Sequence, residues 1–111
     1  MRALQLYTYR IKVIRVIDGD TFVGLVDRGF KDYSKKIIRL GRINAPEVRG
    51  ANKELGIPAK DFLEDALKDK EVIIESTSLD SFGRAIAEVW VEDTNVNDLL
   101  VEKKLAEYKN Y

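Results

Sequence analysis

The sequence contains no cysteine and no histidine among its 111 residues. Without cysteine, disulfides, iron–sulfur clusters and thiolate-bound zinc are excluded. Without histidine, a serine–histidine triad, histidine-ligated metals and an imidazole base are excluded as well. Any acid–base chemistry must therefore use carboxylates, lysine, tyrosine or metal-bound water.

Long hydrophobic runs are also absent. No stretch of about 18 apolar residues occurs, so no membrane span is expected. The first nine residues lack the apolar core of a secretion signal, which predicts a cytoplasmic protein, or a secreted one if a leader has been removed. With 45% hydrophobic and 34% charged residues, we expect one domain, residues 1–111, and a monomer.

Net charge is zero, but the charges are unevenly distributed. Residues 1–59 carry 12 Lys/Arg and 6 Asp/Glu, whereas residues 60–111 carry 7 and 13. The basic half includes Lys31, Lys35, Lys36, Arg39 and Arg42. A nucleic acid could therefore meet one positive face of a neutral protein; the alternative is that two solvated faces differ in sign by chance.

The first part of the chain predicts three strands. Alternation and β-branched residues indicate strands over Tyr7–Ile17, Thr21–Val26 and Lys36–Ile43. Asp18-Gly19 between the first two runs is a strong hairpin signal. A further turn is expected at 27–29, and Pro46 predicts a loop that begins near Asn44.

The remaining chain predicts two helices and two strands. Pro58 suits the first turn of a helix ending near Lys70, whose apolar stripe is formed by Ala59, Phe62, Leu63, Ala66 and Leu67. Strands are expected over Glu71–Ser76 and Ala85–Val91. Asn97 is a plausible N-cap for a last helix from Asp98 to about Lys104, anchored by Leu100 and Leu105.

This order of elements predicts a mostly β fold with helices. A five-stranded Greek-key barrel, with a helix after the third strand and a short C-terminal helix, accounts for it. That is the topology of an OB-fold, which often binds oligonucleotides. A fold does not by itself give a function, so the functional argument depends on the site residues.

Three short segments place charged groups at turns and strand ends. They are Asp18-Gly19-Asp20-Thr21, Arg39 with Asn44-Ala45-Pro46-Glu47, and Asp80-Ser81-Phe82-Gly83-Arg84. Together they supply hard oxygen ligands for a divalent cation, a spare carboxylate for a proton or a water, and two arginines that can clamp phosphate oxygens. A protein that hydrolyses a phosphodiester needs this set of groups.

The candidate residues of these segments, and three others, have expected roles. Asp20, the Asn44 side-chain oxygen and the Ala45 carbonyl would bind Ca²⁺ or Mg²⁺, and Thr21 would lie in a strand with its hydroxyl near the site. Glu47 would hold the attacking water. Lys36, Phe82 and Tyr108 would contact the substrate, with Tyr108 and Tyr111 able to stack a base.

Every segment also has a purely structural reading. Asp18-Gly19 can be a type I′ turn, Arg39 a surface arginine, and residues 44–47 a polar turn. Arg84 can be a turn arginine paired with Asp80, and the tyrosines can belong to the core or the surface. The alternation pattern does not say which face of the Arg39 strand is buried.

Taken together, the segments resemble the staphylococcal nuclease (thermonuclease) family over about Ile11 to Lys109. The matching strings are Ile17-Asp18-Gly19-Asp20-Thr21, Ile38-Arg39-Leu40, Asn44-Ala45-Pro46-Glu47, Phe82-Gly83-Arg84 and Val96-Asn97-Asp98-Leu99-Leu100-Val101. No single string is specific, but their order and gaps are. The resemblance implies an OB-fold and Ca²⁺-dependent hydrolysis of DNA and RNA at the 5′ P–O bond.

The resemblance also implies roles for individual residues. Asp20 would be a calcium ligand, Asn44 would occupy the position of a second calcium aspartate, and Ala45 would offer its backbone carbonyl. Glu47 would orient or deprotonate water, and Arg39 and Arg84 would bind the scissile phosphate. Asp18 would be a supporting carboxylate behind the ligands.

Three departures from the family pattern qualify these roles. Asn44 replaces an aspartate, so we expect weaker metal binding, since an amide oxygen is still a legitimate calcium ligand. Phe82 and Ser81 stand where a tyrosine and a lysine would help to bind nucleotide. The chain stops at Tyr111, where the family usually continues into another helix.

The sequence therefore supports a Ca²⁺-dependent nuclease acting on DNA or RNA, with single strands favoured. Two alternatives remain: a binding module that has lost catalysis, and a protein-interaction or structural domain. The presence of Glu47 with both arginines favours the enzyme, because a pure binder has no need of a glutamate that repels phosphate.

Overall fold

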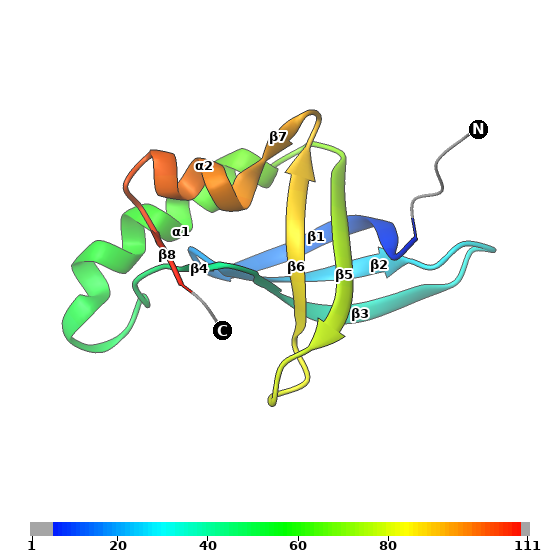
Figure 1. Ribbon diagram of the computed structural model, residues 1–111, viewed down its shortest axis with the longest axis horizontal. Helices are drawn as coiled ribbons and strands as arrows, with labels where there is room; N and C mark the ends of the chain where they lie inside the picture. Colours follow the sequence, from blue (N-terminus) through cyan, green and yellow to red (C-terminus); the bar gives the residue numbers. More distant parts are fainter. Residues whose placement is uncertain (1–5, 110–111) are drawn as a thin grey trace.

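Five strands form a closed barrel in the computed structural model, which describes residues 6–109 (Figure 1). They are β1 (Thr8–Asp18), β2 (Thr21–Asp27), β3 (Tyr33–Leu40), β5 (Val72–Leu79) and β6 (Ala85–Val91). The strands follow the order β3-β2-β1-β5-β6, and a parallel pairing of β3 with β6 closes the barrel. Neighbouring pairs are otherwise antiparallel.

The remaining elements gather at one end of the barrel. Helix α1 (Lys53–Leu67), preceded by the 3₁₀ turn η1 (Gly50–Asn52), and helix α2 (Val96–Glu102) lie at this end in Figure 1. Two short strands, β4 (Ile43–Asn44) and β8 (Glu107–Tyr108), pair with each other, and β7 (Thr94–Asn95) extends the edge of β6. A five-stranded barrel with a helix between its third and fourth long strands is an OB-fold, which confirms the expected fold.

The core consists of alternate residues of the barrel strands packed against one face of α1. In β6 every second residue is buried, from Ala85 to Val91, as the two-residue period of a strand requires. Ala59, Leu63 and Leu67 of α1 join the same cluster of buried residues. The apolar stripe expected for this helix is therefore confirmed, with Phe62 and Ala66 partly buried at its margin.

No helix within residues 6–109 combines the length and the hydropathy that crossing a bilayer demands.

The first hairpin has a different turn from the one expected. Asp18 pairs with Thr21, so the two turn residues are Gly19 and Asp20, and neither has a positive φ. A type I′ turn needs positive φ at both positions, so that interpretation is wrong. A Cβ at Gly19 would lie 2.5 Å from the Cβ of Ala59, which shows that the glycine is required by the approach of α1.

Helix α1 starts earlier than the sequence suggested. It begins at Lys53, so Pro58 lies inside the helix and not in its first turn. The extra turn packs against the preceding loop, where a Cβ at Gly56 would overlap the backbone carbonyl of Glu47. This tertiary contact stabilises a helical turn ahead of the proline, although the proline removes one backbone donor.

Strand β3 also differs from its expected range. It runs from Tyr33 to Leu40, and the chain then turns at Gly41 and Arg42 before β4. Arg42 adopts a φ of 63°, a left-handed conformation that interrupts a strand. The expected continuous strand to Ile43 is therefore wrong, because the break sends residues 43–48 back towards the first hairpin.

The N-cap of α2 is Asn95, which corrects the assignment to Asn97. The Asn95 side chain accepts a hydrogen bond from the N–H of Asp98. Asn97 is instead fully buried and lies inside the helix. Its Nδ2 donates to the carbonyls of Gly41 and Ala87, and its Oδ1 accepts from the N–H of Val89. One side chain thus joins α2, β6 and the end of β3.

This difference between the two asparagines predicts different energetic costs. Asn97→Ala should lower the free energy of unfolding by about 2–4 kcal/mol, because it leaves buried backbone groups without a partner. Asn95→Ala, the matched control, should lose only about 1 kcal/mol, the typical value of an N-cap. Urea unfolding monitored by the fluorescence of Trp90 would measure both. Equal losses would contradict the bridging role of Asn97.

Candidate phosphate and cation site

Asp20 is a buried carboxylate in the turn immediately before β2, with 6% of its surface exposed. Its Oδ2 accepts a hydrogen bond of 2.8 Å from the N–H of Ala45, and its Oδ1 accepts one of 2.9 Å from the Thr21 hydroxyl. Its own backbone carbonyl accepts from the N–H of Leu40. Asp20 therefore connects the first hairpin to the end of β3 and to the segment that follows β4.

Arg39 lies beside Asp20 in the barrel wall and is 8% exposed. Its Nη2 is 3.3 Å from Oδ2 of Asp20 and donates to Oδ1 of Asn44, also at 3.3 Å. Its Nη1 donates to the carbonyl of Leu40. Because a buried charge is costly unless it is paired, these oxygens explain how the barrel holds the arginine. The alternative of a surface arginine is wrong.

The oxygens of Asp20 and Asn44 flank one guanidinium nitrogen, and they are the two side-chain ligands expected for a divalent cation. Both are hard donors of the kind that Ca²⁺ accepts. The set contains only one carboxylate, and no three His, Cys, Asp or Glu side chains within residues 6–109 form a group that could hold a metal. In the structure Arg39 contacts both oxygens, so a cation bound there would have to share them with the arginine.

The β5–β6 turn is organised by Asp80. Its Oδ1 accepts from the N–H groups of Phe82 and Arg84, and its Oδ2 accepts from Nε of Arg84 at 2.6 Å. Desolvation raises the pKa of the Asp80 carboxyl, but the backbone and side-chain hydrogen bonds from Arg84 and the one from Phe82 outweigh it, so the pKa lies below its usual value. The pairing of Arg84 with Asp80, which was the purely structural alternative for this arginine, is thus present.

Arg84 and Arg39 line the same small hollow, which has a volume of about 230 Å³. The parallel pairing of β3 and β6 places Arg39 opposite Ile86, two residues after Arg84. Within residues 6–109, Nε is the guanidinium atom of Arg84 that Asp80 bonds, and the two terminal nitrogens form no hydrogen bond. The side chain of Arg84 is therefore positioned by its turn while its terminal nitrogens remain available to an anion.

Phe82 stands at the rim of this hollow and is 83% exposed. Its ring lies 5.5 Å from Cζ of Arg84. The ring can stack on a base, but it offers no hydroxyl. The structure thus brings together three of the residues expected at the site: Arg39, Arg84 and Phe82. Sequence reasoning missed Leu40 and Ile86, which also line the hollow, because only the β3–β6 pairing unites them.

Glu47 belongs to a segment that is tied to the first hairpin at two points. The N–H of Ala45 bonds to Asp20, and the N–H of Val48 bonds to Oδ1 of Asp18 at 3.1 Å. Asp18 therefore supports the loop, and its expected place behind cation ligands stays a prediction. The Glu47 side chain is exposed and makes no ion pair within residues 6–109, so its role remains a prediction.

Two other expected substrate contacts lie outside the hollow of the arginines. Lys36 lines a different hollow, of about 570 Å³, with Tyr7, Tyr9 and Arg28. Tyr108 donates its hydroxyl to Asp98, a hydrogen bond that raises the pKa of the tyrosine above its usual value. Tyr111 lies outside the described residues.

These features define an OB-fold barrel whose wall holds a buried aspartate–arginine pair beside a hollow lined by two arginines. The sequence profile described as staphylococcal nuclease homologue matches residues 37–111. The chain belongs to this family, as its motifs indicated.

Individual relatives agree with this assignment. The chain is 35% identical over 105 residues to the thermonuclease of Staphylococcus hyicus, covering 90% of this chain and 59% of that protein. It is 33% identical over 109 residues to the thermonuclease of Staphylococcus intermedius, covering 94% and 61%. It is 29% identical over 107 residues to the micrococcal nuclease of Shigella flexneri, covering 88% and 57%. The chain thus spans somewhat more than half the length of these relatives.

The different environments of the two arginines predict different effects on stability. Arg39→Ala should lower the free energy of unfolding by about 3 kcal/mol, because Asp20 would remain buried without its cation. Arg84→Ala should cost about 1 kcal/mol or less, since this pair is partly exposed and Asp80 keeps two backbone donors. Chemical denaturation of both variants would test this. A larger loss for Arg84→Ala would contradict the burial of the Asp20–Arg39 pair.

Proposed function

We propose that this chain hydrolyses phosphodiester bonds of DNA or RNA, preferring single strands, with Ca²⁺ as its cofactor. The observation that carries the proposal is the convergence of Arg39 and Arg84 on one hollow, with the oxygens of Asp20 and Asn44 beside Arg39. Two guanidiniums match the oxygens of a phosphate, because each presents a planar fork of donors.

The two arginines would bind the non-bridging oxygens of the scissile phosphate. Arg84 contributes its terminal nitrogens, which Asp80 holds in place through Nε. Arg39 contributes from the barrel wall, where Asp20 and Asn44 fix its orientation. The terminal nitrogens of Arg84 are already oriented and need no rearrangement as negative charge develops on the phosphate, and such preorganisation is a large term in catalysis.

Asp20, Asn44 and the carbonyl of Ala45 would hold the cation. When bound there, Ca²⁺ would polarise a phosphate oxygen and offset the charge that develops during hydrolysis. The same oxygens flank Nη2 of Arg39, so a cation and the arginine compete for them. The phosphate oxygens would draw Arg39 towards the substrate and leave Asp20 to the cation.

Glu47 would orient the attacking water and accept its proton. The water oxygen forms the new bond to phosphorus and the bond from phosphorus to the 5′ oxygen breaks. The leaving 5′ oxygen takes a proton from solvent, and Glu47 returns to solvent the proton that it accepted. Glu47 is suited to this role because its carboxylate is exposed and unpaired within residues 6–109, while its loop is anchored to Asp18 and Asp20. A base placed in this way contributes about 10²–10⁴-fold to the rate.

A cleavage assay tests the proposal directly. Labelled single-stranded DNA is incubated for several hours with the protein in Ca²⁺ or in chelator. We expect cleavage only in Ca²⁺, and a rate lower by about 10²–10⁴-fold for Glu47→Gln. Glu102→Gln, which removes an exposed carboxylate at the end of α2, is the matched control and should cleave at the normal rate.

Three results would contradict the proposed chemistry. Full activity in chelator would exclude the cation, and normal activity of Glu47→Gln would exclude the base. Salt-dependent binding of the oligonucleotide without any product would identify the second candidate, a binding module without catalysis. The replacement of one ligand aspartate by Asn44, together with Phe82 in place of a tyrosine, is the observation that favours this alternative.

Asn44 offers a separate test of the cation site. Asn44→Asp adds a second carboxylate beside Asp20, so Ca²⁺ should bind about tenfold more tightly, because a charged oxygen attracts the ion more strongly than an amide does. Calorimetric titration with Ca²⁺ measures this without any substrate. An unchanged or weaker affinity would show that residue 44 is not a ligand.

A further inference from the structure

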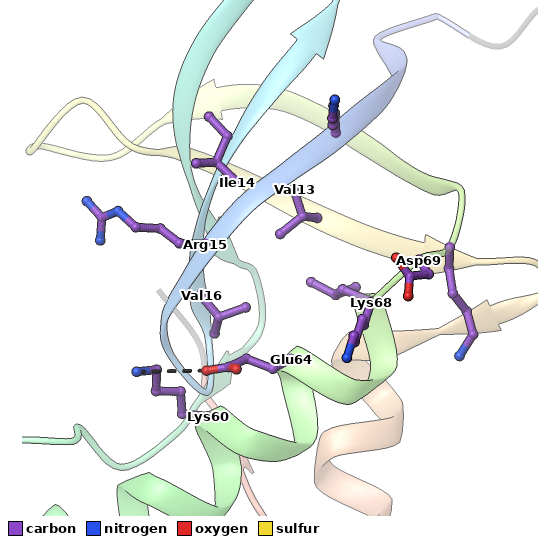
Figure 2. A pocket seen from close by; sticks show the side chains of 11 residues that line it. Val13, Ile14, Arg15, Val16, Lys60, Glu64, Lys68 and Asp69 are labelled. Carbon is purple, nitrogen blue, oxygen red and sulfur yellow. Dashed lines mark ion pairs between the residues drawn. The ribbon is translucent and has the colours of Figure 1, made fainter.

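A second concave surface lies between β1 and the end of α1. This cleft has a volume of about 730 Å³ and is the subject of Figure 2. Lys68 points into it from the end of α1, and Val13 and Val16 face it from β1 (Figure 2). None of the residues assigned to the proposed catalytic site lines this cleft.

The cleft is strongly cationic. Five basic residues line it: Lys12 and Arg15 of β1, Lys60 of α1, and Lys68 and Lys70 beyond the helix. Two acidic residues oppose them, Glu64 and Asp69. Of the five cations only Lys60 is paired, with Glu64 at 3.8 Å. The other four make no ion pair with any residue in the range 6–109.

A bulge in β1 lies along this cationic surface. The register with β2 shifts between Val13 and Arg15, and a bulge of this kind leaves one residue unpaired and re-aims its neighbours. Ile14 is consequently 47% exposed. Arg15 extends to the opposite side of β1 from Lys68 in Figure 2, so positive charge continues around the edge of the strand.

The cleft adjoins the proposed catalytic site. β1 ends at Asp18, and the turn that follows carries Asp20. Gly19 of this turn abuts Ala59 of α1, and the next residue of the helix, Lys60, lines the cleft. The turn that carries Asp20 is therefore packed against α1 at the residue next to Lys60 of the cleft.

We propose that this cleft binds the phosphodiester backbone of the nucleic acid strand at some distance from the bond that is cut. This proposal rests on the proposed function, which supplies the polyanion. Unpaired cations in a concave surface focus their field and attract an extended polyanion, and several phosphates of one strand can contact Lys12, Lys68 and Lys70 together. The apolar floor formed by Val13 and Val16 suits the sugar and base surfaces between phosphates.

The experiment measures binding without turnover. Fluorescence anisotropy in chelator would follow labelled single-stranded DNA of about 4 and about 16 nucleotides, the range of lengths that an OB-fold binds. Lys12→Gln/Lys68→Gln should weaken binding of the longer strand about tenfold at low salt, and binding of the shorter strand less than twofold. The slope of log affinity against log salt should decrease in magnitude by about 1.4, since each lost phosphate contact on a single strand accounts for about 0.7.

A charge-matched variant provides the control. Lys31→Gln/Lys103→Gln removes the same charge from the β2–β3 turn and from the end of α2, and should leave the length dependence unchanged. An equal loss in both variants would overturn the proposal, because only net charge would then matter. Equal competition by polyglutamate of the same charge would also overturn it, by assigning the cleft to acidic proteins.

The outcomes separate this proposal from the proposed function. If no cleavage occurs but the longer strand still needs Lys12 and Lys68, the cleft is a nucleic-acid surface on a non-catalytic protein. If cleavage occurs and the two double variants bind alike, the enzyme stands and the cleft proposal fails. Thermal unfolding of each variant shows that the fold is intact.

Discussion

The buried ion pair between Asp20 and Arg39 is the interaction on which the site depends. Both groups are almost fully removed from water, so neither would be tolerated alone. Asp20 is stabilised by Ala45 and Thr21, and Arg39 by Leu40 and Asn44. The pair therefore fixes the relative positions of the first hairpin, the end of β3 and the segment after β4. The first hairpin, with Asp20, and the stretch from β4 onwards, with Asn44 and Ala45, carry every cation ligand that we propose.

Helix α1 packs against two of the segments that carry the proposed site residues. Two glycines mark the places where backbone must approach backbone or side chain most closely: Gly19 against Ala59, and Gly56 against the carbonyl of Glu47. The helix thus abuts both the turn that holds Asp20 and the loop that carries Glu47. Its outer side, with β1, forms the basic cleft. One element that contributes no catalytic group of its own connects the two surfaces to which we assign nucleic acid.

Because residue 44 is an asparagine, the proposed cation site has one carboxylate, that of Asp20, where a second aspartate would give it two. With one carboxylate beside one guanidinium, Asp20 and Arg39 neutralise each other, and an added cation must compete with the arginine for oxygens. A phosphate would relieve this competition, because it offers Arg39 another anion. Binding of the cation and binding of the substrate should therefore support each other more strongly here than in a site with two carboxylates.

The sequence alone determined the order of the main strands and helices, and from it the barrel, because short-range alternation and turn residues encode the elements. The family was indicated by the resemblance of the site strings, in their order and spacing. The sequence could not show that Arg39 is buried, since alternation does not say which face of a strand meets the core. The strand break at Arg42, the early start of α1 and the placement of Asn97 were decided by tertiary contacts. The division of the chain into a basic and an acidic half did not predict the cleft either. The cleft combines Lys12 of the basic half with Lys68 and Lys70 of the acidic half. Only barrel closure brings residues so distant in sequence together, because pairing between strands and packing of α1 depend on the whole chain.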